Sequence, residues 1–320
     1  MNELKLTIKY LKRFKMNNKL IGMLALVMVL VFGIGPASAT TWHVNNTSDI
    51  QSIIDNNATN GDTINFTSDT GSTYTSVALT ATKNLNFIGN GVTLVGTGTS
   101  NVLTISSTTG TNITGFTINI NGLKNGITGQ YVYDCRIENN NILNGGDGIN
   151  IFKQYRNLLI NSNTITNMST SYGDGISLVN CVTPETSTST TITNNIINDV
   201  DYGIFLGGYF RGTISGNIIS DCSVAGMDVT IKQGVSSLYA DITDNEITGT
   251  PIGMLLEGNV PSLLLDNNYI EGTSYSIQTT GGFTYPTPHD LIVTFNTLVG
   301  TISQDFKSAV TEHHDNDPEW

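Results

Sequence analysis

Residues Arg136–Ile151 read RIENNNILNGGDGINI, and residues Leu159–Leu178 read LINSNTITNMSTSYGDGISL. Each stretch contains a short aliphatic segment, an Asn, a second aliphatic segment and then Asp-Gly-Ile. Because the same order of residue types returns within one chain, the two stretches are copies of one structural unit.

The Asn of this unit recurs in seven places. The copies are centred on Asn140, Asn163, Asn195, Asn217, Asn245, Asn268 and Asn296. The residues three positions before and two positions after each Asn are aliphatic in every copy. Successive Asn residues are 23, 32, 22, 28, 23 and 28 positions apart, so a constant unit of about 22 residues carries loops of variable length. A second register begins at a Gly followed by Ile or Met, and its apolar residues alternate as in a strand with one buried face.

This repeat predicts an all-β fold. A unit so short cannot bury its apolar face alone and must stack on its neighbours, with strands about 4.8 Å apart. We therefore predict a single-stranded right-handed parallel β-helix, the hand following from strand twist. A leucine-rich repeat is excluded because its Leu pattern is absent. We expect the Asn residues to accept a left-handed turn backbone and to form a structural ladder of stacked amides.

The ends of the chain set the domain boundaries. A basic start, an apolar run over Leu20–Ile34 and the exit Ala37–Ala39 predict a signal peptide over residues 1–39. The run is shorter than the roughly 20 residues of a spanning helix, so we expect cleavage and no stable membrane span, an uncleaved anchor being the alternative. Ser48–Gln51 matches a capping box that opens a helix. We assign residues 40–82 to an N-terminal cap with the first strands, 83–303 to β-helix coils and 304–320 to a C-terminal cap and acidic tail.

Charge and cysteine content limit the function. Residues 1–39 contain six of the 14 Lys and Arg and one of the 26 Asp and Glu, which leaves 8 against 25 and a net charge near −17. We expect no nucleic-acid binding, because such binding needs basic residues to displace the counterions of the phosphate backbone. Cys135, Cys181 and Cys222 could form one disulfide and one free thiol, but we favour three buried small hydrophobic residues.

These coils, together with the opening TSDIQSIIDNNATNGDTINF at residues 47–66, resemble the pectin-lyase-like right-handed parallel β-helix proteins with PbH1 repeats. The N-terminal segment and the Asn- and Thr-rich coils are most similar to exported adhesin-like proteins of methanogenic archaea. The resemblance covers residues 41–303 and implies the fold more strongly than an activity, since one solenoid can support many functions.

Asp147 and Asp174 precede Gly at matching positions and are the candidates for catalysis. On adjacent coils their carboxylates would lie roughly 5 Å apart, where they could act on a glycosidic bond or bind calcium, the one cofactor considered. Asp-Gly is also a common turn pair, and we favour this structural interpretation. The best cationic candidates are Lys153 and Arg156. Residues 40–320 lack the Gly-His-Gly and Arg-x-Lys motifs of polygalacturonase-like enzymes.

Aromatic and acidic residues along the coils are the candidates for ligand binding. Sugar rings pack on aromatic faces while polar side chains bond the hydroxyl groups; the alternative is that the rings only cover loops. The candidates are Tyr155, Tyr172, Tyr202, Phe205, Tyr209 and Asp228. His313 and His314 beside Asp315 and Asp317 could bind a metal, but we favour an acidic tail and expect no metal site.

The sequence favours an exported, non-catalytic surface protein. Its regular solenoid lacks a convergent set of His, Arg, Lys and acids, so we expect an adhesin-like role in which one face binds a polysaccharide or a cell-surface glycan. The alternative is a polysaccharide lyase or glycoside hydrolase acting on an acidic or neutral polysaccharide. A phage-like or envelope structural part is a third option. In each case the protein would be secreted or held at the cell surface.

Overall fold

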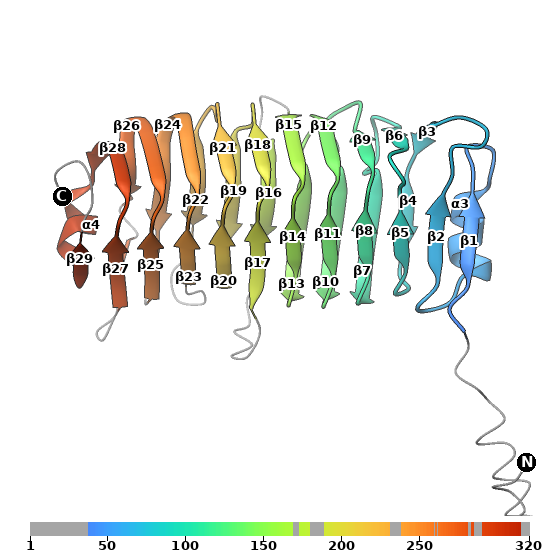
Figure 1. Cartoon of the computed structure of the whole chain (residues 1–320), viewed down its shortest axis with the longest axis horizontal. Coiled ribbons are helices and arrows are strands. Elements are labelled where there is room, and N and C mark those ends of the chain that lie inside the picture. Colours follow the sequence, from blue (N-terminus) through green and yellow to red (C-terminus); the bar gives the residue numbers. More distant parts are fainter. Residues whose placement is uncertain are drawn as a thin grey trace, which may run out of the picture. The chain divides into compact units, whose positions relative to one another are not determined.

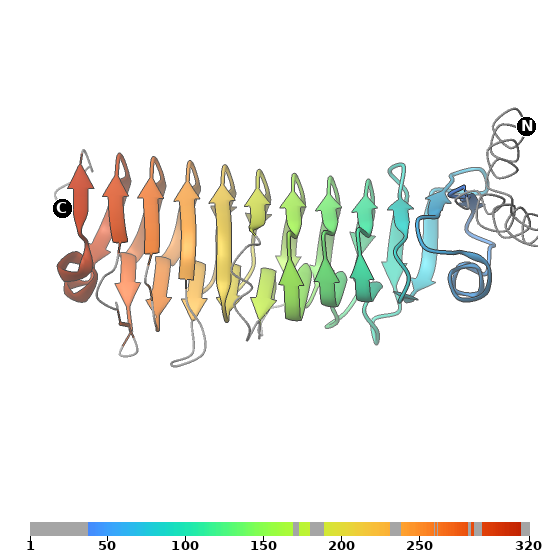
Figure 2. The same cartoon turned by 90° about the horizontal axis from the view of Figure 1, so that it is seen from below.

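The computed structural model describes residues 38–168, 173–179, 189–230, 238–258, 260, 262–280, 283–284 and 290–314. The described residues from Thr41 to His314 belong to one compact unit. This unit is a parallel β-solenoid of about 10 turns with few helices. Its strands stack side by side along the unit in Figures 1 and 2. The coils between the two ends contribute strands to three faces.

The first face, called sheet A, is a 12-stranded parallel sheet in which every strand pairs with the next coil. Its strands are β1 (Thr41–Val44), β2 (Thr63–Phe66), β5 (Asn86–Ile88), β8 (Asn112–Thr114), β11 (Arg136–Glu138), β14 (Leu159–Asn161), β17 (Thr190–Thr193), β20 (Phe210–Ser215), β23 (Leu238–Thr243), β25 (Ser262–Asp266), β27 (Asp290–Thr294) and β29 (Glu312–His314).

The second and third faces also pair in parallel, and the long strands β24 and β26 run through both. The second face contains β3 (Thr73–Val77), β6 (Thr93–Gly96), β9 (Thr117–Asn119), β12 (Asn141–Gly145), β15 (Thr164–Met168), β18 (Ile196–Asn198), β21 (Ile218–Ser220), the starts of β24 (Glu246–Glu257) and β26 (Tyr269–Thr279), and β28 (Thr297–Ile302). The third face contains β4 (Leu79–Ala81), β7 (Leu103–Thr109), β10 (Ile127–Tyr133), β13 (Ile149–Arg156), β16 (Asp174–Val179), β19 (Tyr202–Gly207), β22 (Ala225–Thr230) and the ends of β24 and β26.

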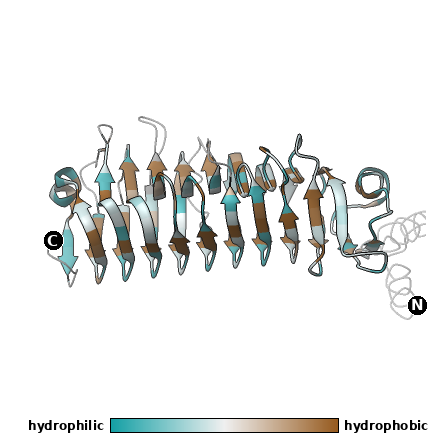
Figure 3. Cartoon of the chain, turned by 90° about the horizontal axis from the view of Figure 1, so that it is seen from above, coloured by the Kyte–Doolittle hydropathy of each residue, from teal (hydrophilic) through white to brown (hydrophobic). Residues whose placement is uncertain are grey.

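The apolar core fills the interior of the coils. All 14 aliphatic residues that flank the repeated Asn are at most 2 % exposed. Burial alternates along most strands, and brown bands of hydrophobic residues recur from coil to coil in Figure 3. The period-two pattern of the sequence is therefore the pattern of burial, because side chains of a strand alternate between its two faces.

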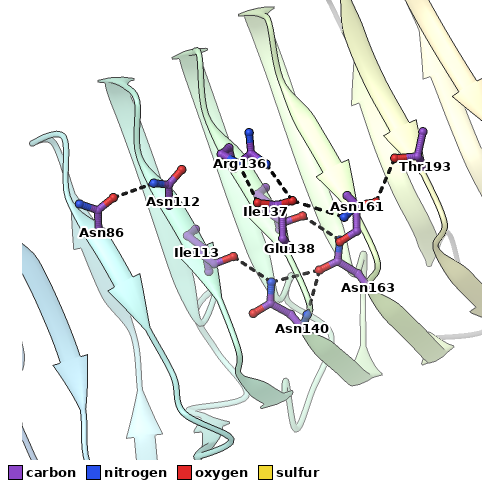
Figure 4. A network of polar contacts seen from close by, with 10 residues as sticks. All are labelled: Asn86, Asn112, Ile113, Arg136, Ile137, Glu138, Asn140, Asn161, Asn163 and Thr193. Atoms are coloured by element: carbon purple, nitrogen blue, oxygen red, sulfur yellow. Dashed lines mark hydrogen bonds and ion pairs between the residues drawn. The ribbon is translucent and has the colours of Figure 1, made fainter.

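The seven repeated Asn residues are buried and form a continuous ladder between sheet A and the second face. In each step the Nδ2 of one Asn donates to the Oδ1 of the Asn on the next coil, at 2.8–3.0 Å. The same Oδ1 accepts the backbone N–H of the earlier Asn at 3.0–3.1 Å. The Nδ2 also donates to a backbone carbonyl, as from Asn140 to Ile113 at 3.0 Å (Figure 4). Phe116 stands in the ladder position of the preceding coil, and its N–H donates to Asn140 Oδ1 at 3.2 Å.

The left-handed turn residue lies one position before each ladder Asn, so the expectation that the ladder Asn itself adopts this backbone was wrong. The residues with positive φ are Asn139, Ser162, Asn194, Gly216, Asp244, Asn267 and Phe295. The physical reason is a division of roles: the residue at −1 turns the chain, and the Asn that follows directs its amide into the interior.

The outer surface of sheet A carries a separate set of polar contacts, also visible in Figure 4. Asn112 Nδ2 donates to Asn86 Oδ1 at 2.7 Å. Arg136 forms an ion pair with Glu138 at 2.7 Å, and Thr193 Oγ1 donates to Asn161 Oδ1 at 3.1 Å. These contacts are partly or fully solvated, so each contributes less than a ladder bond.

Short helices accompany the first and last coils. The first consists of α3 (Ile50–Ser52) and the π-helical η1 (Ile53–Asn57). Its N-cap is Asp49, which accepts Ser52 N–H at 3.0 Å, one position later than the capping box predicted. Gln51 instead exchanges two 2.9 Å hydrogen bonds with the backbone of Thr80. At the other end, α4 (Gln304–Ala309) buries Phe306 and precedes β29.

Cys135 and Cys222 are free and buried, whereas Cys181 lies outside the described residues. Burial raises the pKa of the Cys135 thiol and raises that of Cys222 to about 12. Both behave as small apolar side chains. Within the described ranges, no helix has the length and hydropathy needed to cross a membrane.

Candidate functional site

Asp147, Asp174 and Asp201 lie at one edge of the third face, and Asp228 lies further along the strands, in register with Phe205. We call these four residues the aspartate cluster. Asp174 begins β16, and Asp147 precedes β13 by the same offset, because Ile149 pairs with Ile176. The two carboxylates therefore lie on adjacent coils, about 5 Å apart by strand spacing. Asp147 and Asp174 are half-buried, whereas Asp201 and Asp228 are 8 % and 4 % exposed.

Hydrogen bonds hold the cluster across consecutive coils. Asp147 Oδ1 accepts Asp174 N–H at 3.1 Å, and its Oδ2 accepts a short bond from Asn150 Nδ2. Asp201 Oδ2 accepts Gly173 N–H at 3.3 Å, and its Oδ1 accepts Ser223 Oγ at 2.5 Å. The carboxylates thus have structural partners and still lie at one edge.

The Gly after each of these positions is required by packing, not by turn chemistry. Neither Gly148 nor Gly175 has positive φ, and Asp174-Gly175 lies within β16. A Cβ on Gly148 would lie 2.8 Å from Gly175 O, and a Cβ on Gly175 would lie 2.6 Å from Gly203 O. Asp174-Gly175 therefore lies in a strand and not in a turn, whereas Asp147-Gly148 lies in the bend between β12 and β13. In both coils the close approach leaves no room for a side chain on the Gly.

The carboxyl group of Asp174 has a strongly raised pKa. Burial and the charge of Asp147 raise the pKa of Asp174 to about 8. A hydrogen bond with Ser177 lowers this pKa, and the charges of Asp228 and Asp201 raise it slightly further. Burial also raises the pKa of Asp147, against the bonds from Asn150 and Asp174 N–H. At neutral pH Asp174 holds a proton beside another carboxyl group. A proton donor next to a carboxylate is the arrangement used for acid–base chemistry on glycosidic bonds.

Lys153 and Arg156 do not join the aspartate cluster. They lie in β13, six and nine residues beyond Asp147, which is on the order of 20–30 Å along an extended strand. Lys153 Nζ donates to Gln130 Oε1 at 2.6 Å, and the Arg156 guanidinium lies 4.6 Å from the centroid of the Tyr133 ring. A general base of Lys or Arg type beside the cluster is therefore not formed by these two residues.

The aromatic candidates separate into two groups. Tyr202 and Phe205 are half-buried on β19, with ring centroids 5.7 Å apart. Tyr202 pairs in register with Asp174, and Phe205 pairs with Asp228 on the next coil. Tyr155 and Tyr209 are only 8 % and 7 % exposed, so their rings pack inside the protein and offer little surface to a ligand.

Several predicted residues cannot be placed. Tyr172, Asp315 and Asp317 lie outside the described residues. His313 and His314 belong to β29, where His314 contacts Glu312 at 3.1 Å. Across the part of the chain that the structure describes, no group of three or more His, Cys, Asp and Glu side chains is arranged to hold a metal ion. The calcium expectation stays a prediction.

Sequence reasoning missed Asp201 as a member of this site. Asp201 lies two positions before the Gly of its coil, not one, because a Tyr is inserted between them. Ser177 pairs with Asn150 and Phe205 in the same outward file. Aligning every carboxylate within two positions of the Gly register would have placed Asp201 as well.

Comparisons with known proteins give one family. Residues 110–295 match the family model described as "Periplasmic copper-binding protein (NosD)". No curated protein matches the chain.

Solved structures also resemble the chain. An alginate lyase from Paenibacillus sp. str. FPU-7 is 16 % identical, with 76 % of this chain and 98 % of that one covered and a TM-score of 0.46. A polygalacturonase from Erwinia carotovora is 13 % identical, with 79 % and 96 % covered and a TM-score of 0.43. A mutant tailspike protein of E. coli bacteriophage HK620 is 12 % identical, with 94 % and 75 % covered and a TM-score of 0.46.

Proposed function

Because the chain belongs to the family of the periplasmic copper-binding protein NosD, we propose that it acts outside the cytoplasm, as an exported scaffold that binds a polysaccharide along its third face. Export would use residues 1–39, and the role would be adhesin-like at the cell surface. The α3–η1 segment would shield the first coil from pairing with other chains.

The family description names copper. Copper prefers imidazole, thiolate and thioether ligands. Among the described residues, His43 lies in β1 and His313 and His314 in β29, at opposite ends of sheet A and on the order of 50 Å apart by strand spacing. Cys135 and Cys222 are buried thiols with raised pKa. The described His and Cys donors therefore do not form a copper site.

The observation that carries the proposal is the outward file of the third face. Asn150, Ser177, Phe205 and Asp228 pair in register on four consecutive coils. Tyr202 supports Phe205 from the same strand. A sugar polymer can pack a ring face on Tyr202 and Phe205 and bond the Asn150 amide, because these three residues are half-buried. Ser177 and Asp228 are 3 % and 4 % exposed and support the file from beneath. A solenoid keeps this spacing rigid along the chain of the ligand.

We expect Phe205→Ala to weaken polysaccharide binding about 5-fold or more, because an aromatic contact of this kind contributes at least about 1 kcal/mol. The measurement is the dissociation constant for a soluble neutral glucan and a soluble polyuronate by isothermal titration calorimetry. Phe295→Ala is the matched control, since Phe295 is 57 % exposed and lies at the turn between sheet A and the second face. Equal dissociation constants for Phe205→Ala and the unmodified protein would contradict the third-face site.

Glycoside hydrolysis at Asp147 and Asp174 is the second candidate, and the raised pKa of Asp174 is the observation that favours it. Asp174 would protonate the leaving oxygen and Asp147 would act as the carboxylate partner. We expect release of reducing ends from the bound polysaccharide to fall about 100-fold in Asp174→Asn. In the unmodified protein, release should decline above pH about 8, where Asp174 loses its proton.

The control for hydrolysis is Asp69→Asn, an exposed carboxylate outside the third face. Release that survives Asp174→Asn unchanged would rule out this mechanism. If the unmodified protein releases no sugar at all, polysaccharide binding without catalysis is the function that remains.

A further inference from the structure

A second polar site lies on sheet A. A hollow of about 220 Å³ opens on the outer surface of sheet A across β20, β23 and β25, and Arg211, Tyr239, Asp241 and Ser262 line it. Register explains this grouping. Arg211 pairs with Tyr239, which pairs with Ser262, while Asp241 pairs with Thr213 in the neighbouring outward file.

The wall of the hollow is positioned by packing. Tyr239 is 39 % exposed, and its ring lies 6.2 Å from the ring of the buried Tyr209. Tyr209 is itself anchored, since its carbonyl accepts the Tyr155 hydroxyl at 3.1 Å. The Arg211 guanidinium lies 5.6 Å from the centroid of the Tyr239 ring. The cation and the aromatic face are therefore arranged together before any ligand arrives.

The chemistry of the hollow differs from one end to the other. A guanidinium binds carboxylate or sulfate oxygens through paired N–H donors. The Tyr239 face suits the apolar face of a sugar ring, and Ser262 and Thr213 can bond its hydroxyl groups. Asp241 repels an anion but accepts hydroxyl protons. A ligand with both features would place its anionic group toward Arg211 and its hydroxyl groups toward Asp241.

We propose that this hollow binds one pyranose ring that carries an anionic group, either a carboxylate or a sulfate ester. Its volume is below the roughly 300–1,000 Å³ of a pocket for a drug-sized ligand, which fits a single ring of a longer chain. The site goes beyond the third-face proposal, because its residues belong to a different sheet.

The test uses three defined oligosaccharides and calorimetric titration of the full chain. The probes are a galacturonate trimer, the same trimer after reduction of its carboxyl groups, and a galactose trimer with one sulfate ester per ring. Arg211→Gln should weaken binding of the two anionic probes at least about 10-fold and leave the neutral probe unchanged, because it removes the charge and the paired donors. Tyr239→Leu should weaken all three about 5-fold by removing the stacking face.

The controls separate this site from bulk charge and from the third face. Arg136→Gln removes a cation of the same sheet that lies outside the hollow and pairs with Glu138, and it should change nothing. Ser262→Glu, on the outward surface of β25, should repel the anionic probes without disturbing the core. Phe205→Ala should leave binding of the trimers at this site intact.

Equal losses in Arg211→Gln and Arg136→Gln would overturn the proposal, as would equal affinity for the neutral and anionic probes. If Arg211→Gln weakens binding of only one anionic probe, that probe identifies the anionic group of the ligand as a carboxylate or as a sulfate ester. Full affinity for the anionic probes in a folded Ser262→Glu variant would also exclude the hollow.

Discussion

We expect Asn217→Leu to lower the free energy of unfolding by about 4 kcal/mol. Asn217 Oδ1 accepts both the backbone N–H and the Nδ2 of Asn195, at 3.0 and 2.9 Å. Its Nδ2 donates to Asn245 Oδ1 at 2.9 Å and to Ile192 O at 3.0 Å. Leu can make none of these bonds, and it leaves buried donors and acceptors without partners in a dry interior. Each such group costs about 1–3 kcal/mol.

Chemical denaturation followed by circular dichroism measures this effect, and amide hydrogen exchange shows whether protection is lost first in the coils next to Asn217. Asn112→Ala is the matched control on the same solenoid, because Asn112 makes its contact to Asn86 on the outer surface of sheet A. We expect a cost of at most about 1 kcal/mol there. Similar costs for the two variants would mean that the buried ladder contributes no more than solvated amide contacts.

The second large effect concerns pH, because the stability of the solenoid should fall as pH rises from about 4 to about 8. The pKa of Asp174 is about 8 in the folded protein and 3.8 in an ordinary Asp. Between these values the folded state holds one more proton than the unfolded state, so the free energy of unfolding decreases by about 1.4 kcal/mol per pH unit. The total is on the order of 5 kcal/mol across that window. Asp147 acts in the same direction, since burial raises its pKa too.

Asp174→Asn should remove most of this slope and make the variant more stable than the unmodified protein at pH 8. The neutral amide retains the shape of the side chain and carries no charge to desolvate. Denaturation midpoints at pH 5, 6, 7 and 8 measure the slope for both proteins, and Asp69→Asn should retain it. A midpoint of the unmodified protein that stays constant from pH 5 to pH 8 would show that Asp174 is ionised without penalty.

Residues that repeat in every coil could be placed from the sequence, whereas residues that differ from coil to coil could not. Positions that repeat at a fixed place in every coil were predicted correctly: the inward Ile137 and Ile142 of one copy have equivalents in all the others, and the ladder Asn is buried each time. The turn residue was misplaced by one position, because Asn139 and Asn140 are both Asn and only one of them faces inward. Local residue type could not separate these two roles.

The functional residues were harder to predict for a different reason. Tyr155 and Tyr209 are aromatic residues of the kind that bind sugars, but both are buried. Tyr209 packs beneath Tyr239, and the Tyr155 hydroxyl, from two coils away, donates to the Tyr209 carbonyl. Asp201 was missed because its coil shifts the carboxylate by one position. Loop length between coils decides these contacts, and the loops do not repeat.

The sequence by itself determined the parallel β-solenoid, the inward aliphatic files and the column of seven amides, because a periodic pattern can be satisfied only when equivalent residues of every coil lie one above another. Only the tertiary structure decided which side chains meet across coils: the four carboxylates that hold a proton on Asp174, and the Arg211 and Tyr239 hollow on sheet A. These groupings depend on the lateral register of neighbouring coils and on burial, which act between residues more than twenty positions apart and leave no local pattern.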